Sequence, residues 1–286
     1  MIRKIGKVAI IRLLVMAVAM VAVAIAMQVL PRVLAKQLPA AVSGKWLNPA
    51  AAIILALAMI GGYRLAVRWL EGRKAKELEF GPSLALTPLG VVVGLGLFCL
   101  VYAVLWAAGH AVFHGFVGTS GLITAVSAAV AAAVSEELVF RGVLFRVLED
   151  SLGTLLAVIL SAGVFGLLHG VNPGATVVST AAIALEAGVL LAAAYTATRS
   201  LWFPIGLHFG WNFTEGGIFG AAVSGGKSHG LFDVRLTGAD LWTGGAFGPE
   251  ASLLAVGLCL LLALGLLWQT VRAGRWVPLR FRMILD

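Results

Sequence analysis

The sequence predicts an all-α fold, a polytopic transmembrane bundle of about eight helices with both chain termini on the cytoplasmic side. The first observation is composition: 60% of the 286 residues are hydrophobic and 12% are charged, whereas a soluble domain carries about 25% charge. The second is that the apolar residues form runs of about 20, the length that crosses a hydrocarbon core of ~30 Å. The third is an uneven distribution of Lys and Arg among the connections.

Eight apolar runs follow one another along the chain. The first is too long for the hydrophobic part of a signal peptide and has no evident cleavage site, so we expect it to be a span. Turn-forming residues such as Asn172-Pro173-Gly174 separate the runs. The longest connection, from Ser224 to Glu250, is polar and Gly-rich, and we expect an irregular loop there. The runs lie at about 8–30, 50–69, 87–109, 121–148, 153–170, 177–198, 201–222 and 251–271.

The Lys and Arg residues predict the orientation. With a cytoplasmic N-terminus, the cytoplasmic connections hold most of them, including the cluster Arg64, Arg68, Arg73, Lys74 and Lys76. Positive residues concentrate on the cytoplasmic side of membrane proteins, and an even number of spans returns the C-terminus to that side. The same rule accounts for the net charge of +8, so we expect lipid contact and no nucleic-acid partner. Short loops and an Ala/Gly/Val/Leu-rich composition are typical of a prokaryotic inner-membrane protein.

The fourth run carries charges that lipid does not tolerate. It contains Glu136, Glu137 and Arg141, and each acid near the bilayer centre costs roughly 2.5 to 3.5 kcal/mol. Glu137 and Arg141 are four residues apart, on one helix face, and can neutralise each other. Glu136 is turned about 100° away. We therefore expect Glu136 to face something other than Arg141.

The fifth and seventh runs carry polar residues at the same spacing. Phe165 and His169 lie four apart on the fifth run, and His208 and Asn212 lie four apart on the seventh. Each pair therefore shares a helix face. With the free carboxylate of Glu136, these three helices bring two imidazoles and one carboxamide to a predicted common cavity.

Two kinds of hydrolysis fit this set of groups. A carboxylate beside an imidazole can take a proton from water and return it to a leaving amine, while a second imidazole and an amide N–H stabilise the oxyanion. Alternatively, Glu136, His169 and His208 hold Zn²⁺ with an open position for water. Both lead to cleavage of a peptide or protein substrate, without a cofactor in one case and with zinc in the other.

These motifs resemble those of the CAAX prenyl protease and bacteriocin-processing family of intramembrane endopeptidases (CPBP or ABI). The resemblance implies that Glu136 activates water with help from His169, that His208 and Asn212 stabilise the oxyanion, and that Glu137 and Arg141 fix the helix and the cavity charge. The family has been described both as metalloproteases and as metal-independent glutamate enzymes; its members cleave after a prenylated cysteine or act in peptide processing and bacteriocin immunity. The residues that carry the resemblance are Glu136-Glu137 with Arg141, Phe165 with His169, and His208 with Asn212.

The predicted organisation follows from this resemblance, which covers roughly residues 115–222. We expect N-terminal transmembrane helices in 1–114, a CPBP-type protease core in 115–222, an extracytoplasmic loop in 223–250, and the last helix with a basic cytoplasmic tail in 251–286.

Other features leave alternatives open. A proton-coupled transporter also buries Glu and His in the membrane, and a family member without activity would serve as a membrane scaffold or immunity partner. Glu186 is a further intramembrane acid without an assigned role, and we expect Glu215 to line the same cavity. Gly206 and Gly210 flank His208 at the spacing typical of a close helix contact.

Overall fold

The apolar runs form helices in the computed structural model of the chain, which describes residues 47–81 and 83–280 together with Val15, Met16, Val18 and Ala22. Apart from those four positions, the predicted run at 8–30 lies outside the described residues. The larger elements are α4 (Leu47–Ala66), α5 (Leu86–Ala107), β1 (Ala111–Phe116), α6 (Leu122–Glu137), α7 (Arg146–Leu152), α8 (Thr154–His169), α9 (Val177–Ile183), α10 (Val189–Thr198), α11 (Trp202–Asn212), β2 (Phe232–Leu236), α12 (Asp240–Thr243) and α13 (Leu253–Arg272).

Short segments of other helix types continue or connect these elements. Four are π-helical, with the wider i→i+5 hydrogen-bond pattern that often occurs at functional sites. Three of the four extend the helices that carry the polar motifs or Glu186. The π segments are η1 (Val67–Glu71), η3 (Leu138–Phe145), η4 (Ala184–Gly188) and η5 (Phe213–Ile218), and the 3-10 segments are η2 (Lys76–Leu78) and η6 (Pro249–Ala251).

Five helices of the described residues are long and apolar enough to cross a membrane, and a sixth apolar helix, Thr154–His169, is shorter. The predicted helical, membrane-spanning architecture is therefore confirmed to this extent. The predicted run at 201–222 corresponds to α11 and η5. The five long helices are Pro49–Glu71, Leu86–Ala107, Leu122–Leu152, Val177–Thr198 and Leu253–Arg272.

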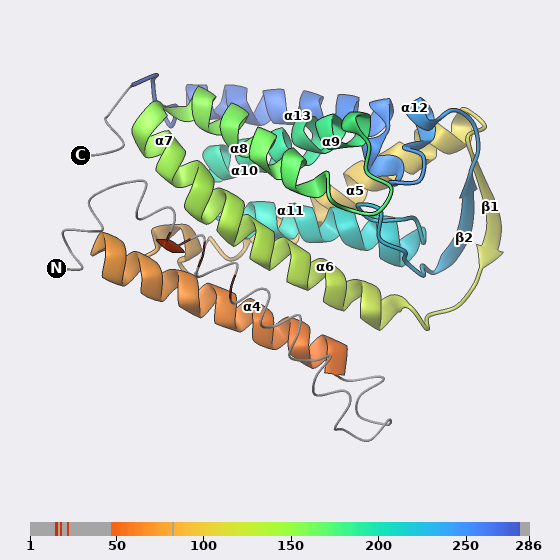
Figure 1. Cartoon of the computed structure of the whole chain (residues 1–286), viewed down its shortest axis with the longest axis horizontal. Coiled ribbons are helices and arrows are strands. Elements are labelled where there is room, and N and C mark those ends of the chain that lie inside the picture. Colours follow the sequence, from red (N-terminus) through yellow and green to blue (C-terminus); the bar gives the residue numbers. More distant parts are fainter. Residues whose placement is uncertain (1–14, 17, 19–21, 23–46, 82, 281–286) are drawn as a thin grey trace.

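The continuous helix of α6, η3 and α7 runs diagonally through the bundle (Figure 1). Helix α4 packs on one side of it, and α8 and α11 pack on the others. Helix α11 also lies against α5 at very short range: a Cβ added to Gly206 would sit 2.1 Å from the Thr87 oxygen, and one added to Gly210 would sit 2.3 Å from the Val91 oxygen. The predicted close contact at these glycines is confirmed, and it fixes the position of the helix that carries His208.

A two-stranded ribbon departs from the predicted all-α fold. Strands β1 and β2 pair antiparallel, with Ala111 opposite Leu236 and Phe116 opposite Phe232. The ribbon lies at one end of the bundle (Figure 1). The connection expected to be irregular contains β2, α12 and η6. Period-two patterning in these short segments was too weak to predict strands, which form because two distant connections meet.

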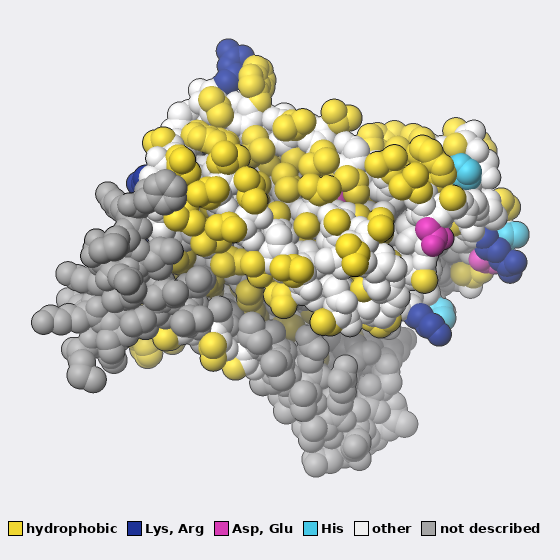
Figure 2. Space-filling view, turned by 45° about the horizontal axis from the view of Figure 1, so that its top comes forward, with side chains coloured by type: hydrophobic (Ala, Val, Ile, Leu, Met, Phe, Trp, Pro, Cys, Tyr) yellow, Lys and Arg dark blue, Asp and Glu magenta, His cyan; other side chains and the backbone are white. Residues whose placement is uncertain are grey.

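Hydrophobic side chains cover the outside of the bundle and also fill its core. Val92, Leu261 and Leu167 are 67%, 68% and 70% exposed. Figure 2 shows hydrophobic side chains spread across one face, with Lys, Arg and His toward its margins. An apolar surface of this extent would be costly in water and is the surface that a lipid environment requires. The protein is an integral membrane protein.

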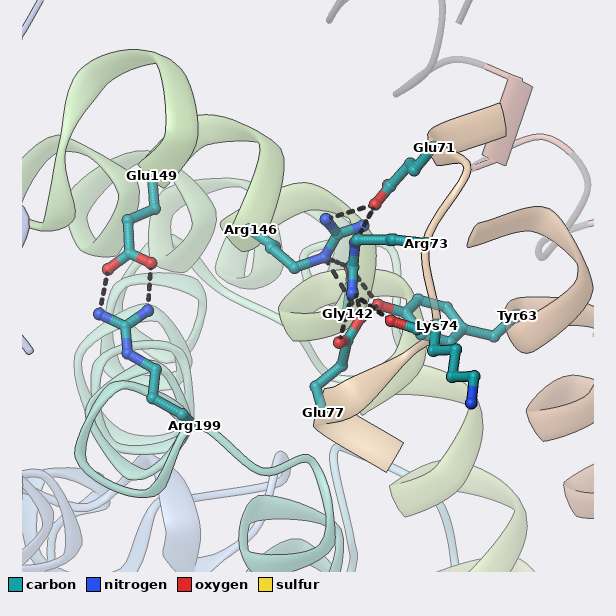
Figure 3. A network of polar contacts seen from close by, with 9 residues as sticks. All are labelled: Tyr63, Glu71, Arg73, Lys74, Glu77, Gly142, Arg146, Glu149 and Arg199. Carbon is teal, nitrogen blue, oxygen red and sulfur yellow. Dashed lines mark hydrogen bonds and ion pairs between the residues drawn. The ribbon is translucent and has the colours of Figure 1, made fainter. Parts of the chain in front are cut away.

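A polar network closes the end of the bundle opposite the ribbon. Arg146 Nη1 donates to Glu71 Oε2 at 2.9 Å, and Arg73 Nη2 donates to Glu77 Oε1 at 2.7 Å. The Tyr63 hydroxyl lies within hydrogen-bond distance of both a Glu77 carboxylate oxygen and the Gly142 carbonyl oxygen and donates its one hydrogen between them. Figure 3 shows these side chains converging from α4, the segment after it, and the α6–α7 helix. The network ties the 72–79 segment to the bundle.

Candidate active site

The acidic pair lies where α6 passes into η3. Glu137 is fully buried, and its Oε1 accepts a 2.8 Å hydrogen bond from Arg141 Nη1. Arg141 is itself 1% exposed and also donates from Nη2 to the Ala187 and Gly188 carbonyls of η4 at 3.0 and 3.2 Å. The Glu137–Arg141 pair expected from their spacing is therefore present. It joins the α6–η3 helix to η4.

Glu137 has a second partner that the sequence did not indicate. Its Oε1 lies 2.9 Å from Nδ1 of His208 on α11. A carboxylate oxygen only accepts, so Nδ1 of His208 carries the proton in this contact. This fixes the ring orientation and leaves Nε2 of His208 to face elsewhere.

His169 is oriented by its own helix. Its Nδ1 lies 2.8 Å from the Phe165 carbonyl oxygen. Because a carbonyl accepts only, Nδ1 is the donor, and Nε2 carries the lone pair in the neutral ring. The Phe165 ring packs on the imidazole, with ring centroids 4.4 Å apart, and beneath the Arg141 guanidinium at 4.8 Å. Phe165 thus separates the Arg141 cation from the imidazole of His169.

Glu136 faces both imidazoles without touching either. Its Oε2 lies 3.9 Å from His169 Nε2 and 4.0 Å from His208 Nε2. Both distances exceed the ~3.2 Å limit of a hydrogen bond and match a separation that one water molecule can bridge. Oε2 is buried and accepts no hydrogen bond from any described residue. The structure thus brings Glu136, His169 and His208 together from three helices.

A small cavity of about 20 Å³ lies beside these rings. That is room for about one water molecule. Asn212 is among its lining residues, one helical turn after His208, so its carboxamide lies on the same side as the imidazole. The residues lining it include Phe165, His169, Glu186, Leu190, Leu207, His208, Trp211, Asn212, Ser224 and Glu250.

Three further acids surround the site, and two of them line the cavity. Glu186 is 2% exposed and Glu250 is 3% exposed. Glu250 Oε1 accepts the Ser224 N–H at 2.7 Å, and Glu215 Oε1 lies 3.4 Å from the Glu250 N–H. Burial raises the pKa of Glu250, and hydrogen bonds from Glu215 and Ser224 oppose that rise.

One of the three acids near the site, Glu250, was not predicted from the sequence. Glu186, an intramembrane acid in the sequence, lines the cavity, whereas Glu215, which we expected to line it, is not among the lining residues. Glu250 lies at the end of the connection for which the sequence predicts only an irregular loop. It reaches the site because the connection after η5 folds back over the bundle, where Gly225 N–H donates to the Phe247 carbonyl. No local pattern signals that return.

Glu136, His169 and His208 are also the predicted ligands of the zinc alternative. Within the described residues, no group of three or more His, Cys, Asp or Glu side chains is arranged to hold a metal ion. The predicted set of Glu136, His169 and His208 is therefore not supported as a metal site by this geometry.

The comparison with known families finds a match in the middle of the chain. Residues 118–214 match the family described as type II CAAX prenyl endopeptidase, Rce1-like. The match confirms the resemblance predicted from the motifs and includes Glu136, His169, His208 and Asn212. No curated protein and no solved structure matches the chain.

Proposed function

From the match of residues 118–214 to the type II CAAX prenyl endopeptidase family, we propose that this protein is an intramembrane endopeptidase. It hydrolyses peptide bonds of membrane-associated or lipidated substrates with a water molecule activated by Glu136 and His169. The observation that carries the proposal is the position of Glu136 Oε2, 3.9 and 4.0 Å from the Nε2 atoms of His169 and His208.

In the first step, water lies between Glu136 Oε2 and His169 Nε2. The lone pair on Nε2, left by the Nδ1–H donation to Phe165, accepts one water hydrogen and orients the molecule. Glu136 takes the other proton as the water oxygen attacks the substrate carbonyl carbon. The carbonyl oxygen then carries the negative charge of a tetrahedral intermediate.

His208 and Asn212 stabilise that oxyanion. Asn212 donates from its amide. His208 donates from Nε2, which requires an imidazolium because Nδ1–H is already engaged by Glu137. The buried Glu137 carboxylate, which accepts the Nδ1–H of His208, compensates the added charge. Preorganised donors of this kind contribute about 10²–10³-fold to the rate.

In the last step, the C–N bond breaks and Glu136 returns its proton to the leaving amine. The products are a carboxylic acid on one peptide, which keeps the second proton of the attacking water, and an amine on the other, and Glu136 is regenerated as the base. The new carboxylic acid then releases its proton to solvent. Both protons of the water are accounted for in this way, so Ser and Cys nucleophiles are not needed.

We also propose a topology, a membrane and a substrate class for this enzyme. The chain has eight spans, both termini lie in the cytoplasm, and the membrane is the inner membrane of a prokaryote. The substrate is a peptide whose cleavage site follows a prenylated cysteine or a similarly lipidated residue. The Lys and Arg distribution supports a site that opens toward the cytoplasm.

A purified assay tests the proposal. Full-length protein in proteoliposomes is given a farnesylated CAAX-type peptide, and the cleaved products are identified by mass spectrometry, for wild type and Glu136→Gln. We expect cleavage by wild type only, and unchanged cleavage after dialysis against a chelator. Equal cleavage by both proteins would refute the proposal that Glu136 catalyses the hydrolysis. Loss of the wild-type activity on dialysis would favour the zinc alternative.

If the farnesylated peptide is not cleaved, the substrate class is tested in cells. New peptide termini in membranes are compared between cells that carry wild type and cells that carry Glu136→Gln. Termini that depend on Glu136 would identify another substrate. Their absence, with the same cellular phenotype for both proteins, would favour the scaffold or immunity alternative.

A further inference from the structure

A basic hollow lies at the polar end of the first described span. It follows Pro49–Glu71 directly and has a volume of about 720 Å³, which is within the range of ~300–1,000 Å³ that ligand sites occupy. Its lining has five basic side chains and one acid, Glu79. The basic residues are Arg64, Arg68, Arg73, Lys74 and Lys76.

Three of the five basic side chains are exposed and form no ion pair with an acidic side chain of the described residues. Arg73 is held by Glu71 and Glu77. Arg68, Lys74 and Lys76 are exposed, and none of them forms an ion pair with a described residue. Figure 3 shows Lys74 extending away from the Glu71–Arg73–Glu77–Arg146 network. Three cations are therefore free to meet an anion.

The walls of the hollow are held in place. Arg73 Nε bonds Glu71 at 2.6 Å, and Trp202 Nε1 donates to the Glu79 carbonyl at 3.0 Å. The Arg64 guanidinium lies 4.1 Å above the Phe80 ring and bonds the Leu78 carbonyl. A fixed wall loses little entropy on binding a ligand. The segment that presents Lys74 and Lys76 is thus preorganised.

Two exposed aromatic side chains belong to this end of the span. Phe80 lines the hollow and is 57% exposed, and Trp69, which follows Arg68 in the chain, is 64% exposed. Aromatic side chains at this level of a membrane protein lie among lipid headgroups. A soluble anion gains nothing from such side chains, whereas a phospholipid places its phosphate on the cations and its glycerol and acyl chains on the rings.

We propose that Arg68, Lys74 and Lys76 bind the phosphate of an anionic phospholipid, with Trp69 and Phe80 against its apolar part. Basic pockets at the cytoplasmic side of membrane helices bind lipids of this class. The site is separate from the groups assigned to hydrolysis, and it stands whether or not the protein is a protease.

Lipid binding by the full-length protein in detergent tests this site. Native mass spectrometry gives the dissociation constants of phosphatidylglycerol and phosphatidylcholine with the same acyl chains. We expect tighter binding of phosphatidylglycerol. In the variant Arg68→Gln/Lys74→Gln/Lys76→Gln, its affinity falls about 100-fold, or about fivefold for each charge removed, and phosphatidylcholine binding is unchanged.

A charge-matched control separates the hollow from general basicity. Lys227→Gln/Arg235→Gln/Arg272→Gln removes three exposed charges elsewhere and keeps the phosphatidylglycerol affinity. Equal affinity of wild type for both lipids, or an equal loss in the control, would overturn the proposal. Displacement of phosphatidylglycerol by millimolar inorganic phosphate would assign the site to a free anion instead. If the triple variant does not fold, Lys74→Gln alone is expected to lose about fivefold.

Discussion

Two polar clusters are buried in this bundle, and they pair their acids differently. In the network at the end of the bundle, Arg146 bonds Glu71 at 2.9 Å and Arg73 bonds Glu77 at 2.7 Å. In the candidate active site, Glu136 Oε2 is 3.9 Å or more from its imidazole neighbours. In the first cluster acid and base are in direct hydrogen-bond contact, and in the second the acid lies beyond hydrogen-bond range of both imidazoles.

The comparison separates structural acids from reactive ones. A carboxylate in direct contact with a guanidinium stays ionised and holds two segments together, but it cannot easily receive a proton. A carboxylate held at one water's distance can. Glu137 combines the two situations, because it contacts Arg141 directly and also orients His208.

The largest effect should come from Glu136→Gln. The amide keeps the size of the side chain but cannot take the proton from water, so we expect kcat/KM to fall about 10⁴-fold. Because Glu136 Oε2 bonds no described residue, the unfolding temperature in detergent should not change. Peptide cleavage and thermal unfolding check the two expectations, with the exposed Asp240→Asn as control; a stability loss equal to that of a network variant would contradict the distinction.

In the network, the effect should be on stability. Arg146→Met removes one of the two guanidinium groups that contact both Glu71 and Glu77, and Arg73 is the other. Breaking a buried pair completely costs about 3–5 kcal/mol, so we expect a loss of at most this size. Chemical unfolding in detergent measures the loss. Arg272→Met, at an exposed position above Trp268, is the control and should cost far less. Wild-type stability of Arg146→Met would mean that the network is not structural.

Glu137→Gln should show an intermediate effect on activity. The amide oxygen still accepts from His208 Nδ1, but the charge that supports an imidazolium is gone, and we expect kcat to fall about 10- to 100-fold with little change in KM. The variant Glu137→Gln/Arg141→Met removes both charges and so tests whether an unpaired Arg141 causes the loss. Recovery of activity in this double variant would assign the effect to Arg141 rather than to His208.

The smallest effect should be the pH dependence of stability that Glu77 provides. Burial alone would raise the pKa of Glu77, but the hydrogen bond from Arg73 and the charge of Arg146 hold it below its ordinary value of 4.5. The stabilisation is therefore present above pH 4.5 and is lost as the pH falls through the lower folded-state value. Unfolding temperatures of wild type and Glu77→Gln from pH 7 to 3 should converge at low pH; parallel curves would exclude this origin.

Much of the fold and part of the site were predictable from local patterns. Runs of about 20 apolar residues gave the helices that appear at Leu86–Ala107 and Leu253–Arg272, because crossing a membrane imposes a minimum length. The ribbon was not predictable, since β1 and β2 pair across more than a hundred residues. Glu250 was missed for the same reason, as its place depends on the return of the chain after η5.

Membrane insertion and the sharing of a helix face by particular side chains can be read from the amino-acid sequence, since they follow from hydropathy and the 3.6-residue period. How those faces are turned toward one another depends on the packing of whole helices. The rotation of α11, set by close packing of its glycines on α5, brings His208 onto Glu137. Helix rotation depends on contacts between distant segments, and no local pattern contains it.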